Sequence, residues 1–325
     1  MMVNLHMNEN PYLPNEKIRQ AAIKGLEKIN RYSELKYLTE LKELLGNYNN
    51  VASERIVLSP GSDLLIREII NIFSKDRKII MVNPSFFPVA QYALKQARRL
   101  TKIQISPPDF KLDRNLLLNE LNEPTLLIID NPNNPTGKIL IDDSLAGKIL
   151  QNRNALLLVD EAYYEFSWQT FVGLIKKYPN LAITRTMDKA FSLAGLRLGY
   201  LLMGDYFKDH FSNLPVYLST PTLFATIEAL KKPEYLYQNI KKIISERTRI
   251  EEELKKTGIE VFPGSTNFIL IKSKVPDFAR KLMDSGIIIK DLSEEWLNDF
   301  YRISIGLPDE NDALLSIVKK IYKDA

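Results

Sequence analysis

Residues 155–165 read ALLLVDEAYYE, and this stretch decides the fold class. Its first five residues, Ala155–Val159, are all apolar, which is typical of a short strand that is buried on both faces. Two further runs, Thr125–Ile129 and Leu181–Thr184, are also followed by polar residues. Because amphipathic stretches lie between such runs, the order is that of an α/β chain, and it predicts a mainly parallel sheet between helices.

The alternation of apolar runs and amphipathic stretches extends outward over most of the chain. Further strands are expected at Arg55–Leu58, Lys78–Val82, Arg99–Ile105, Gly199–Met203, Phe268–Lys272 and Tyr301–Ile305. After Pro221 the pattern changes, since the long charged stretch Tyr235–Lys256 is typical of a helix and fewer strands follow. We therefore expect three parts, namely an N-terminal arm that adds to a small domain (1–40), a large domain (41–220) and a small α+β C-terminal domain (221–325).

The composition excludes several classes of protein and site. The 325 residues contain no cysteine and only two histidines, which excludes disulfides, thiolate sites and multi-histidine metal centres, so no metal is expected. With 44 basic and 40 acidic residues the net charge is only +4, and the lysines of Tyr235–Lys256 alternate with glutamates, so no nucleic-acid partner is expected. No apolar run approaches the ~20 residues of a membrane helix and none resembles a signal peptide, so we expect a cytoplasmic protein with no membrane partner.

Polar and charged side chains follow the predicted strands at the point where each strand ends. After Arg55–Leu58, the sequence Gly61-Ser62-Asp63 opens a helix, whose free backbone N–H groups can bind an anion. The other candidates are Asn134 after Thr125–Ile129, Asp160 and Tyr163 after Ala155–Val159, and Thr186, Lys189 and Arg197 after Leu181–Thr184. Because ligands of open parallel sheets bind just beyond the carboxyl ends of the strands, we expect these groups to gather at one edge of the sheet.

This combination of groups suits one kind of cofactor. A lysine can bond covalently to an aldehyde, and a buried carboxylate can keep a pyridine nitrogen protonated so that the ring accepts electrons. A phenol and an amide can hydrogen-bond a ring oxygen, while a helix N-terminus and an arginine can hold a phosphate. Together they predict a site for pyridoxal 5′-phosphate (PLP).

The order of these motifs resembles that of the fold-type I PLP-dependent aminotransferases of class I and II, and among them the histidinol-phosphate aminotransferases. The resemblance covers nearly the whole chain, at Asn8–Tyr12, Arg31–Tyr32, Asn133–Gly137, Asp160–Phe166, Lys189–Tyr200, Asn267–Phe268 and Arg302–Gly306. It implies that the large domain binds PLP and that the enzyme transfers an amino group from histidinol phosphate to 2-oxoglutarate. An aromatic or broad-range amino-acid aminotransferase and a phosphothreonine decarboxylase of the same fold stay open as alternatives.

The resemblance also implies a role for each residue around the cofactor ring. Lys189 matches the lysine that bonds to the cofactor and moves the substrate's proton, and Asp160 matches the partner of the pyridinium nitrogen. Asn134 and Tyr163 match the donors to the ring hydroxyl oxygen. Phe86 matches the aromatic residue that stacks on the ring.

Other matched residues are expected to bind phosphate. The resemblance implies that Ser62 and Asp63 place backbone amides at the cofactor phosphate and that Thr186 and Arg197 bind it with their side chains. Tyr32 matches a tyrosine that reaches the phosphate of the neighbouring subunit's cofactor, which implies a homodimer with shared active sites.

The substrates are small molecules, and the resemblance implies three residues on their side of the site. Arg302 matches the arginine that binds the anionic end of the substrate, a carboxylate or a phosphate. Asn10 and Tyr12 belong to the N-terminal motif and are expected beside the substrate. For Arg302 a surface salt bridge in the small domain is the alternative.

The sequence departs from the pattern of the family at two positions. Asp188 stands directly before the lysine, where the family usually has a serine that helps to bind the phosphate. A carboxylate and a phosphate repel each other by about a kcal/mol or more, so Asp188 must turn away, pair with a cation or weaken cofactor binding. Lys290 stands where the family often has an arginine, which puts an inter-strand or a substrate-side contact in doubt but not the chemistry.

Overall fold

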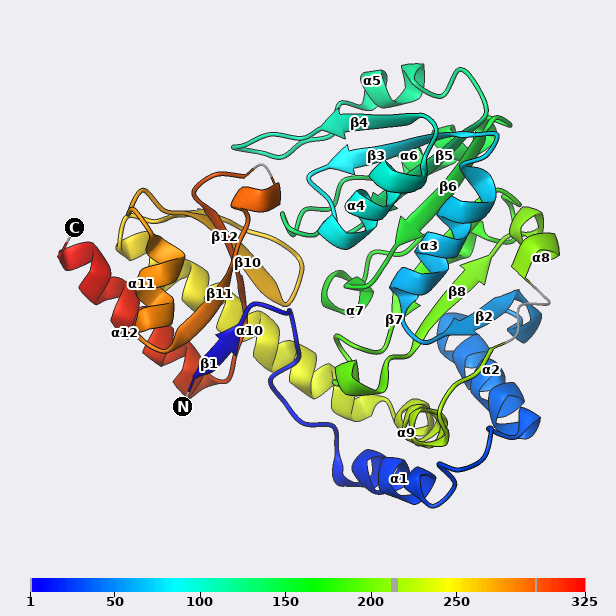
Figure 1. Cartoon of the computed structure of the whole chain (residues 1–325), viewed down its shortest axis with the longest axis horizontal. Coiled ribbons are helices and arrows are strands. Elements are labelled where there is room, and N and C mark those ends of the chain that lie inside the picture. Colours follow the sequence, from blue (N-terminus) through cyan, green and yellow to red (C-terminus); the bar gives the residue numbers. More distant parts are fainter. Residues whose placement is uncertain (1, 212–215, 296, 325) are drawn as a thin grey trace.

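The computed structural model describes residues 2–211, 216–295 and 297–324, which form two separate sheets with helices around them (Figure 1). The larger sheet has seven strands in the order β2-β8-β7-β6-β5-β3-β4. Their bounds are Ile56–Ser59 (β2), Lys78–Asn83 (β3), Leu100–Gln104 (β4), Thr125–Asp130 (β5), Ala155–Asp160 (β6), Leu181–Thr186 (β7) and Gly199–Met203 (β8). All pairs are parallel except those of β8, which runs antiparallel to both β2 and β7. The predicted mainly parallel sheet is thereby confirmed.

The apolar runs form strands because both faces of the larger sheet are covered. Along β6, Leu157 and Val159 belong to one hydrophobic core, whereas Leu156 and Leu158 belong to a second core on the opposite face. Successive side chains of a strand point to opposite faces, so a strand with two cores needs an unbroken apolar sequence.

Helices from different parts of the chain cover these two faces. One face packs against α3 (Ser62–Phe73), α4 (Phe87–Gln96) and α8 (Asp205–Phe211). The other packs against α2 (Leu35–Asn49), α5 (Arg114–Asn119), α6 (Asp143–Gln151) and α7 (Tyr164–Ser167). This two-sided arrangement leaves the carboxyl ends of the parallel strands as the place for a ligand.

The smaller sheet brings the two ends of the chain together. Its order is β1-β11-β12-β10-β9, with bounds Val3–Leu5 (β1), Glu260–Phe262 (β9), Phe268–Lys272 (β10), Ile287–Asp291 (β11) and Phe300–Ser304 (β12). The helices beside it are α10 (Glu234–Lys256), α11 (Phe278–Asp284) and α12 (Pro308–Lys323). Strand β1 pairs in parallel with β11, so the N-terminal residues join the smaller sheet.

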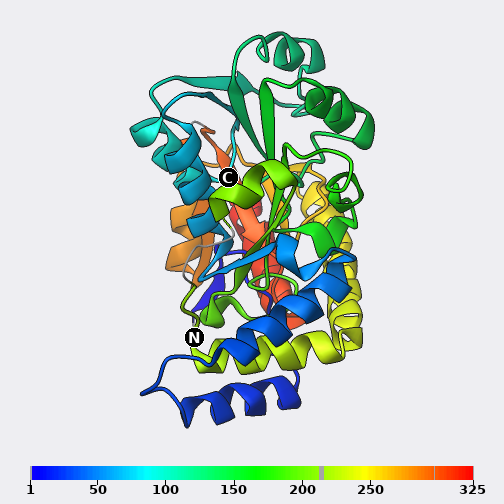
Figure 2. The same cartoon turned by 90° about the vertical axis from the view of Figure 1, so that its right-hand side faces the viewer.

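Two further helices lie together along the lower edge of the molecule in the view of Figure 1. Helix α9 (Thr220–Lys231) lies between α1 (Glu16–Leu26) and α2 (Figure 2). A Cβ atom at Gly25 would lie 2.5 Å from the backbone of Pro221, so α1 and α9 need a glycine there to approach closely. Helix α9 begins at the second domain boundary that we predict, and it packs on the N-terminal helices α1 and α2. The domain boundaries at residues 40 and 220 stay a prediction.

Candidate active site

The N-terminal segment between β1 and α1 crosses from the smaller sheet to the carboxyl ends of the larger sheet's strands (Figure 1). There it contacts three of the predicted site residues through hydrogen bonds. Lys189 Nζ donates to the carbonyl oxygen of Met7 at 3.1 Å, and Arg302 Nη2 donates to that of His6 at 2.9 Å. Asn8 Nδ2 donates to the Tyr163 hydroxyl at 2.8 Å. The segment therefore holds together side chains from both sheets.

Lys189 lies in the turn between β7 and the short helix Ala194–Leu196. Its pKa is lowered to about 8, mainly by burial and also by the positive charges of Arg302 and Arg197, while the attraction of Asp188 opposes the shift. A lysine with such a pKa is partly neutral near pH 8, so its nitrogen can act as a nucleophile and as a base.

Asp160 is the last residue of β6 and is only 7% exposed. It accepts a hydrogen bond of 3.0 Å from the hydroxyl of Thr184, its register partner on β7. Burial raises its pKa to about 7, and the carboxylate of Asp130 raises it as well. A cation beside Asp160 would lower this pKa and be bound tightly, which is the environment that a protonated pyridine nitrogen requires.

Tyr163 is buried, and the N-terminal segment fixes its hydroxyl. Asn8, which donates to that hydroxyl, is itself held by Ser304 of β12, since its backbone N–H donates to Ser304 Oγ at 2.8 Å. Burial raises the pKa of Tyr163 to about 12 although Arg302 opposes the shift, so the phenol keeps its proton and can donate it in a hydrogen bond.

Asp130 is a site residue that the sequence analysis missed. Its Oδ2 accepts hydrogen bonds from the backbone N–H of Asn134 at 2.8 Å and of Phe86 at 3.2 Å, and its Oδ1 accepts one of 2.9 Å from Asn133 Nδ2. One carboxylate thus joins the two loops that carry the predicted ring contacts. Asp130 ends an apolar strand, as Asp160 does, and this position was the signal that could have found it.

The predicted phosphate site lies where β8 passes the N-terminus of α3. A Cβ atom at Gly199 would lie 2.0 Å from the backbone nitrogen of Ser62, so only glycine allows the two backbones to lie this close. Arg197 lies over the same helix end, and its Nη2 donates to Asp63 Oδ1 at 2.8 Å. Thr186 lies near Arg197, since its hydroxyl donates to the carbonyl oxygen of Leu198, the residue after Arg197, at 3.2 Å.

Asp188 forms an ion pair with Arg197. Of the three possibilities that the sequence allowed, the structure therefore shows pairing with a cation. Asp188 is 5% exposed, and its Oδ1 has no hydrogen-bond partner among the described residues. Burial raises its pKa, against the opposing effect of Arg197.

Arg302 is 8% exposed and lies on β12. Its Nη1 donates to Asn134 Oδ1, and its Nε is buried with no partner among the described residues. The alternative of a surface salt bridge is therefore wrong. Lys290 is its register partner on β11, and Lys290 Nζ lies 3.6 Å from the buried carboxylate of Glu295.

The structure does not bring every predicted residue to this place. Asn10 lies there, since its Nδ2 donates to the carbonyl oxygen of Ala190 at 3.0 Å. Tyr12 follows it closely, since its backbone N–H donates to Asn10 Oδ1 at 3.0 Å, and Lys242 Nζ of α10 lies 5.1 Å from its ring centroid. Tyr32 is 86% exposed in the loop between α1 and α2, and its ring lies 5.5 Å from that of Tyr217.

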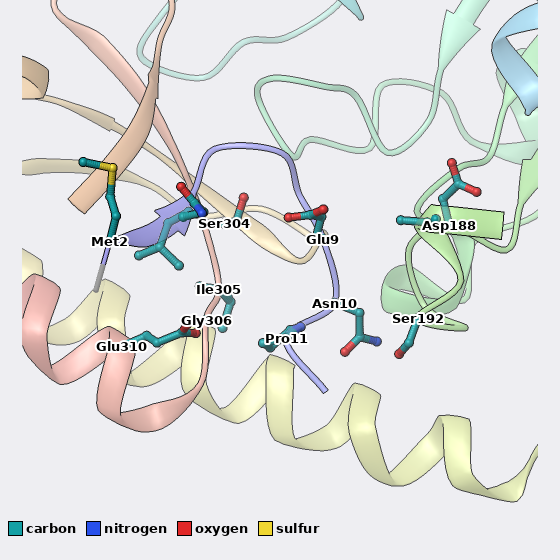
Figure 3. Close-up of a pocket in the computed structure, with 14 residues that line it drawn as sticks. Met2, Glu9, Asn10, Pro11, Asp188, Ser192, Ser304, Ile305, Gly306 and Glu310 are labelled. Carbon is teal, nitrogen blue, oxygen red and sulfur yellow. The ribbon is translucent and has the colours of Figure 1, made fainter. Parts of the chain in front are cut away.

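A cavity of about 390 Å³ adjoins the site on the side of Asp188. The N-terminal segment with Glu9 and Asn10 lies between Asp188 on one side and Glu310 of α12 on the other (Figure 3). The described residues that line it include three carboxylates and neither lysine nor arginine, so this cavity does not attract anions.

The chain is similar to known proteins over nearly its whole length. Residues 1–317 match the family model of aminotransferase class I and II. The histidinol-phosphate aminotransferase of Sulfurisphaera tokodaii is 34% identical over 332 aligned positions, which cover 99% of this chain and 91% of that protein. Histidinol-phosphate aminotransferase 2 of Archaeoglobus fulgidus is 32% identical over 98% of this chain and 93% of its own length. The structure of the histidinol-phosphate aminotransferase from Clostridium acetobutylicum has a TM-score of 0.91 at 25% identity and covers 100% of both chains.

Proposed function

The chain belongs to the class I and II aminotransferase family, and on that premise we propose that it is a PLP-dependent histidinol-phosphate aminotransferase that uses 2-oxoglutarate as the amino acceptor. The names of its relatives support this substrate. The observation that carries the proposal is that Lys189 and Arg302 hydrogen-bond adjacent carbonyl groups, those of Met7 and His6. A reactive amine and a buried guanidinium are thus held at a short separation along the same segment. This arrangement suits a substrate with an amino group at one end and an anion at the other.

The residues of the site fit PLP. Asp160 offers a buried carboxylate to the ring nitrogen, and Asn134 and Tyr163 offer polar groups to the ring oxygen. Arg197 and the N-terminus of α3 are suited to the phosphate. When bound, PLP supplies a ring that accepts electrons from the substrate carbon that loses its proton.

Lys189 has two tasks in this proposal. Its Nζ would hold the cofactor covalently. Once released, the same nitrogen would take the proton from the substrate Cα and deliver it to the cofactor carbon C4′. The lowered pKa of about 8 supports the second task, because a neutral amine is needed to accept a proton near neutral pH. The Met7 carbonyl keeps the nitrogen near the N-terminal segment between these steps.

Arg302 is suited to both substrates. Histidinol phosphate has no carboxylate, so its phosphate is the group that an arginine can bind, whereas glutamate presents a carboxylate. A guanidinium donates paired hydrogen bonds to either anion. The unpaired, buried Nε supports this role, because a buried donor without a partner is unfavourable unless a ligand satisfies it.

The proposal includes a homodimer in which each active site uses Tyr32 of the neighbouring subunit. Several large apolar side chains near Tyr32 are exposed, which supports an interface there: Ile23, Leu26, Ile29, Leu35 and Tyr217. In the described part of the chain no helix is long and apolar enough to cross a membrane. A cytoplasmic location belongs to the proposal because a biosynthetic role, as the names of the relatives indicate, suits that compartment.

A half-reaction screen tests the substrate. The PLP form of the enzyme would be mixed separately with histidinol phosphate, glutamate, phenylalanine and phosphothreonine, and the absorbance change to the amino form of the cofactor would be followed. We expect fast conversion with histidinol phosphate and with glutamate. Conversion with phenylalanine but not with histidinol phosphate would favour the aromatic aminotransferase, and release of CO₂ from phosphothreonine would favour the decarboxylase.

A further inference from the structure

The arginine at the phosphate site is already engaged by two carboxylates. Arg197 is the cation over the N-terminus of α3, and it is paired with both Asp188 and Asp63. Asp63 also pairs with Arg67 of α3 at 3.9 Å, so these four groups together have no net charge when all are ionised. An anion that approaches Arg197 therefore meets a guanidinium that is already neutralised.

The backbone holds Asp188 firmly beside Arg197. The N–H of Asp188 donates to Thr186 Oγ1 at 3.1 Å, and the N–H of Met187 donates to the carbonyl oxygen of Leu198 at 2.9 Å. These bonds tie the turn that carries Asp188 to the residue that follows Arg197. The backbone at Asp188 is therefore fixed. Its carboxylate can move away from Arg197 only by rotation of the side chain.

A displaced Asp188 side chain finds no lysine or arginine among the described residues that line the cavity on its other side. The cavity there is lined by Glu9 and Glu310, and the carboxylates of Glu9 and Asp188 point away from each other (Figure 3). Lys189 is the other cation that acts on Asp188, but in the proposed function it carries the cofactor. Separating Asp188 from Arg197 is thus unfavourable, and leaving it in place keeps a negative charge beside the phosphate.

We infer that Asp188 is an internal competitor for the phosphate of PLP, so that this enzyme holds its cofactor more loosely than a serine at the same position would allow. The inference rests on the proposed function. The observations that support it are the ion pair of Asp188 with Arg197, the burial of Asp188, and the lack of a partner for its Oδ1 among the described residues. Its consequence is that the loaded fraction of the enzyme follows the concentration of free PLP.

Binding of two ligands to the protein without PLP separates the phosphate from the ring. Pyridoxine 5′-phosphate and pyridoxine both lack the aldehyde, so neither bonds to Lys189, and their dissociation constants can be measured by calorimetry. We expect Asp188→Ser to bind pyridoxine 5′-phosphate about tenfold or more tightly than the unchanged protein, since a like charge is removed from its surroundings. Binding of pyridoxine should not change.

Two further variants complete the test. Asp188→Asn keeps the size of the side chain and should tighten phosphate binding in the same direction, which preserves the test where serine disturbs the fold. Asp205→Ser removes an exposed aspartate that pairs with Arg55 beyond the opposite end of β8, so it changes the net charge equally and should have no effect. Equal or weaker phosphate binding by both Asp188 variants would overturn the inference. If the unchanged protein and all variants bind neither ligand, the proposed use of PLP fails, and the inference with it.

Discussion

Asp130 and Asp160 are register partners at the carboxyl ends of two neighbouring parallel strands, and both are buried. Each is held by donors of its own, Asp130 by two backbone N–H groups and Asp160 by Thr184. Burial and their mutual repulsion raise the pKa of Asp160 to about 7. Two buried carboxylates so close together favour the binding of a cation beside them. The protonated ring of PLP would be such a cation.

Asp160→Asn should lower kcat by several orders of magnitude. The amide keeps the shape of the side chain but has no negative charge to hold a proton on the ring nitrogen, so the ring accepts electrons poorly. Single-turnover kinetics with histidinol phosphate would measure the loss, and Asp143→Asn on the exposed start of α6 would serve as the matched control. Near-normal turnover in Asp160→Asn would refute the assigned role.

Asp130→Asn should lower the free energy of unfolding by about 1–3 kcal/mol, because an asparagine offers one oxygen where the carboxylate accepts three hydrogen bonds, and at least one buried donor is left unpaired. Urea denaturation of the protein without PLP would measure the change. The variant should also loosen the loops that carry Phe86 and Asn134 and so lower kcat/KM. Unchanged stability would show that these bonds do not hold the loops.

Lys189 should react with PLP increasingly fast as the pH rises through about 8, because its neutral form becomes dominant there while an ordinary lysine stays charged until about 10.5. Borohydride reduction and peptide mapping across a pH series would follow the label. Lys189→Ala should lose both the label and turnover. A label that appears first on an exposed lysine such as Lys17 would contradict the assignment.

Tyr32→Phe should weaken PLP binding by about tenfold or more, since a hydrogen bond to a charged acceptor contributes roughly 1.5–3 kcal/mol. Mixed dimers give a sharper test. When Tyr32→Phe and Lys189→Ala subunits are combined, one site per dimer has both Lys189 and the partner's Tyr32, and it should bind PLP with unchanged affinity. Tyr237→Phe on α10 is the control. If mixing restores no tight site, the active sites are not shared.

Arg302→Lys should lower kcat/KM for glutamate and for histidinol phosphate by about ten- to a hundredfold, because a lysine cannot form the paired hydrogen bonds of a guanidinium. Steady-state kinetics with each substrate would measure both losses. Arg19→Lys on the exposed face of α1 should leave them unchanged. Unchanged kinetics for Arg302→Lys with both substrates would exclude Arg302 from anion binding.

The larger sheet could be predicted because its strands carry their own evidence. Runs such as Ala155–Val159 are apolar at every position, which only a strand with two covered faces needs. The direction of β8 could not be predicted, since an apolar run has the same pattern when it is reversed. Strands β1 and β9 have three residues each and show too little alternation to be found.

The sequence pointed to candidate residues at or shortly after the ends of strands, since Asp160 ends β6 and Lys189 lies in the turn after β7. The hydrogen bonds of the N-terminal segment were not predictable, because the carbonyl groups of His6 and Met7 have no sequence signature. The packing of the Tyr12 ring beside Lys242 of α10 has no sequence signature either.

The course of the N-terminal segment has a consequence for the order in which the protein acquires its site during synthesis. Asn8 bonds to Ser304, which lies 296 residues later in the chain. The strands of the larger sheet all leave the ribosome before β12, and domains generally fold as their residues emerge. Residues 6–10 are therefore made before the strands of the larger sheet but fixed after them, once β11 and β12 exist to hold them. A nascent chain that has completed its larger sheet still lacks the contacts of Lys189 and Tyr163 with this segment, so it gains its function only with its final strand.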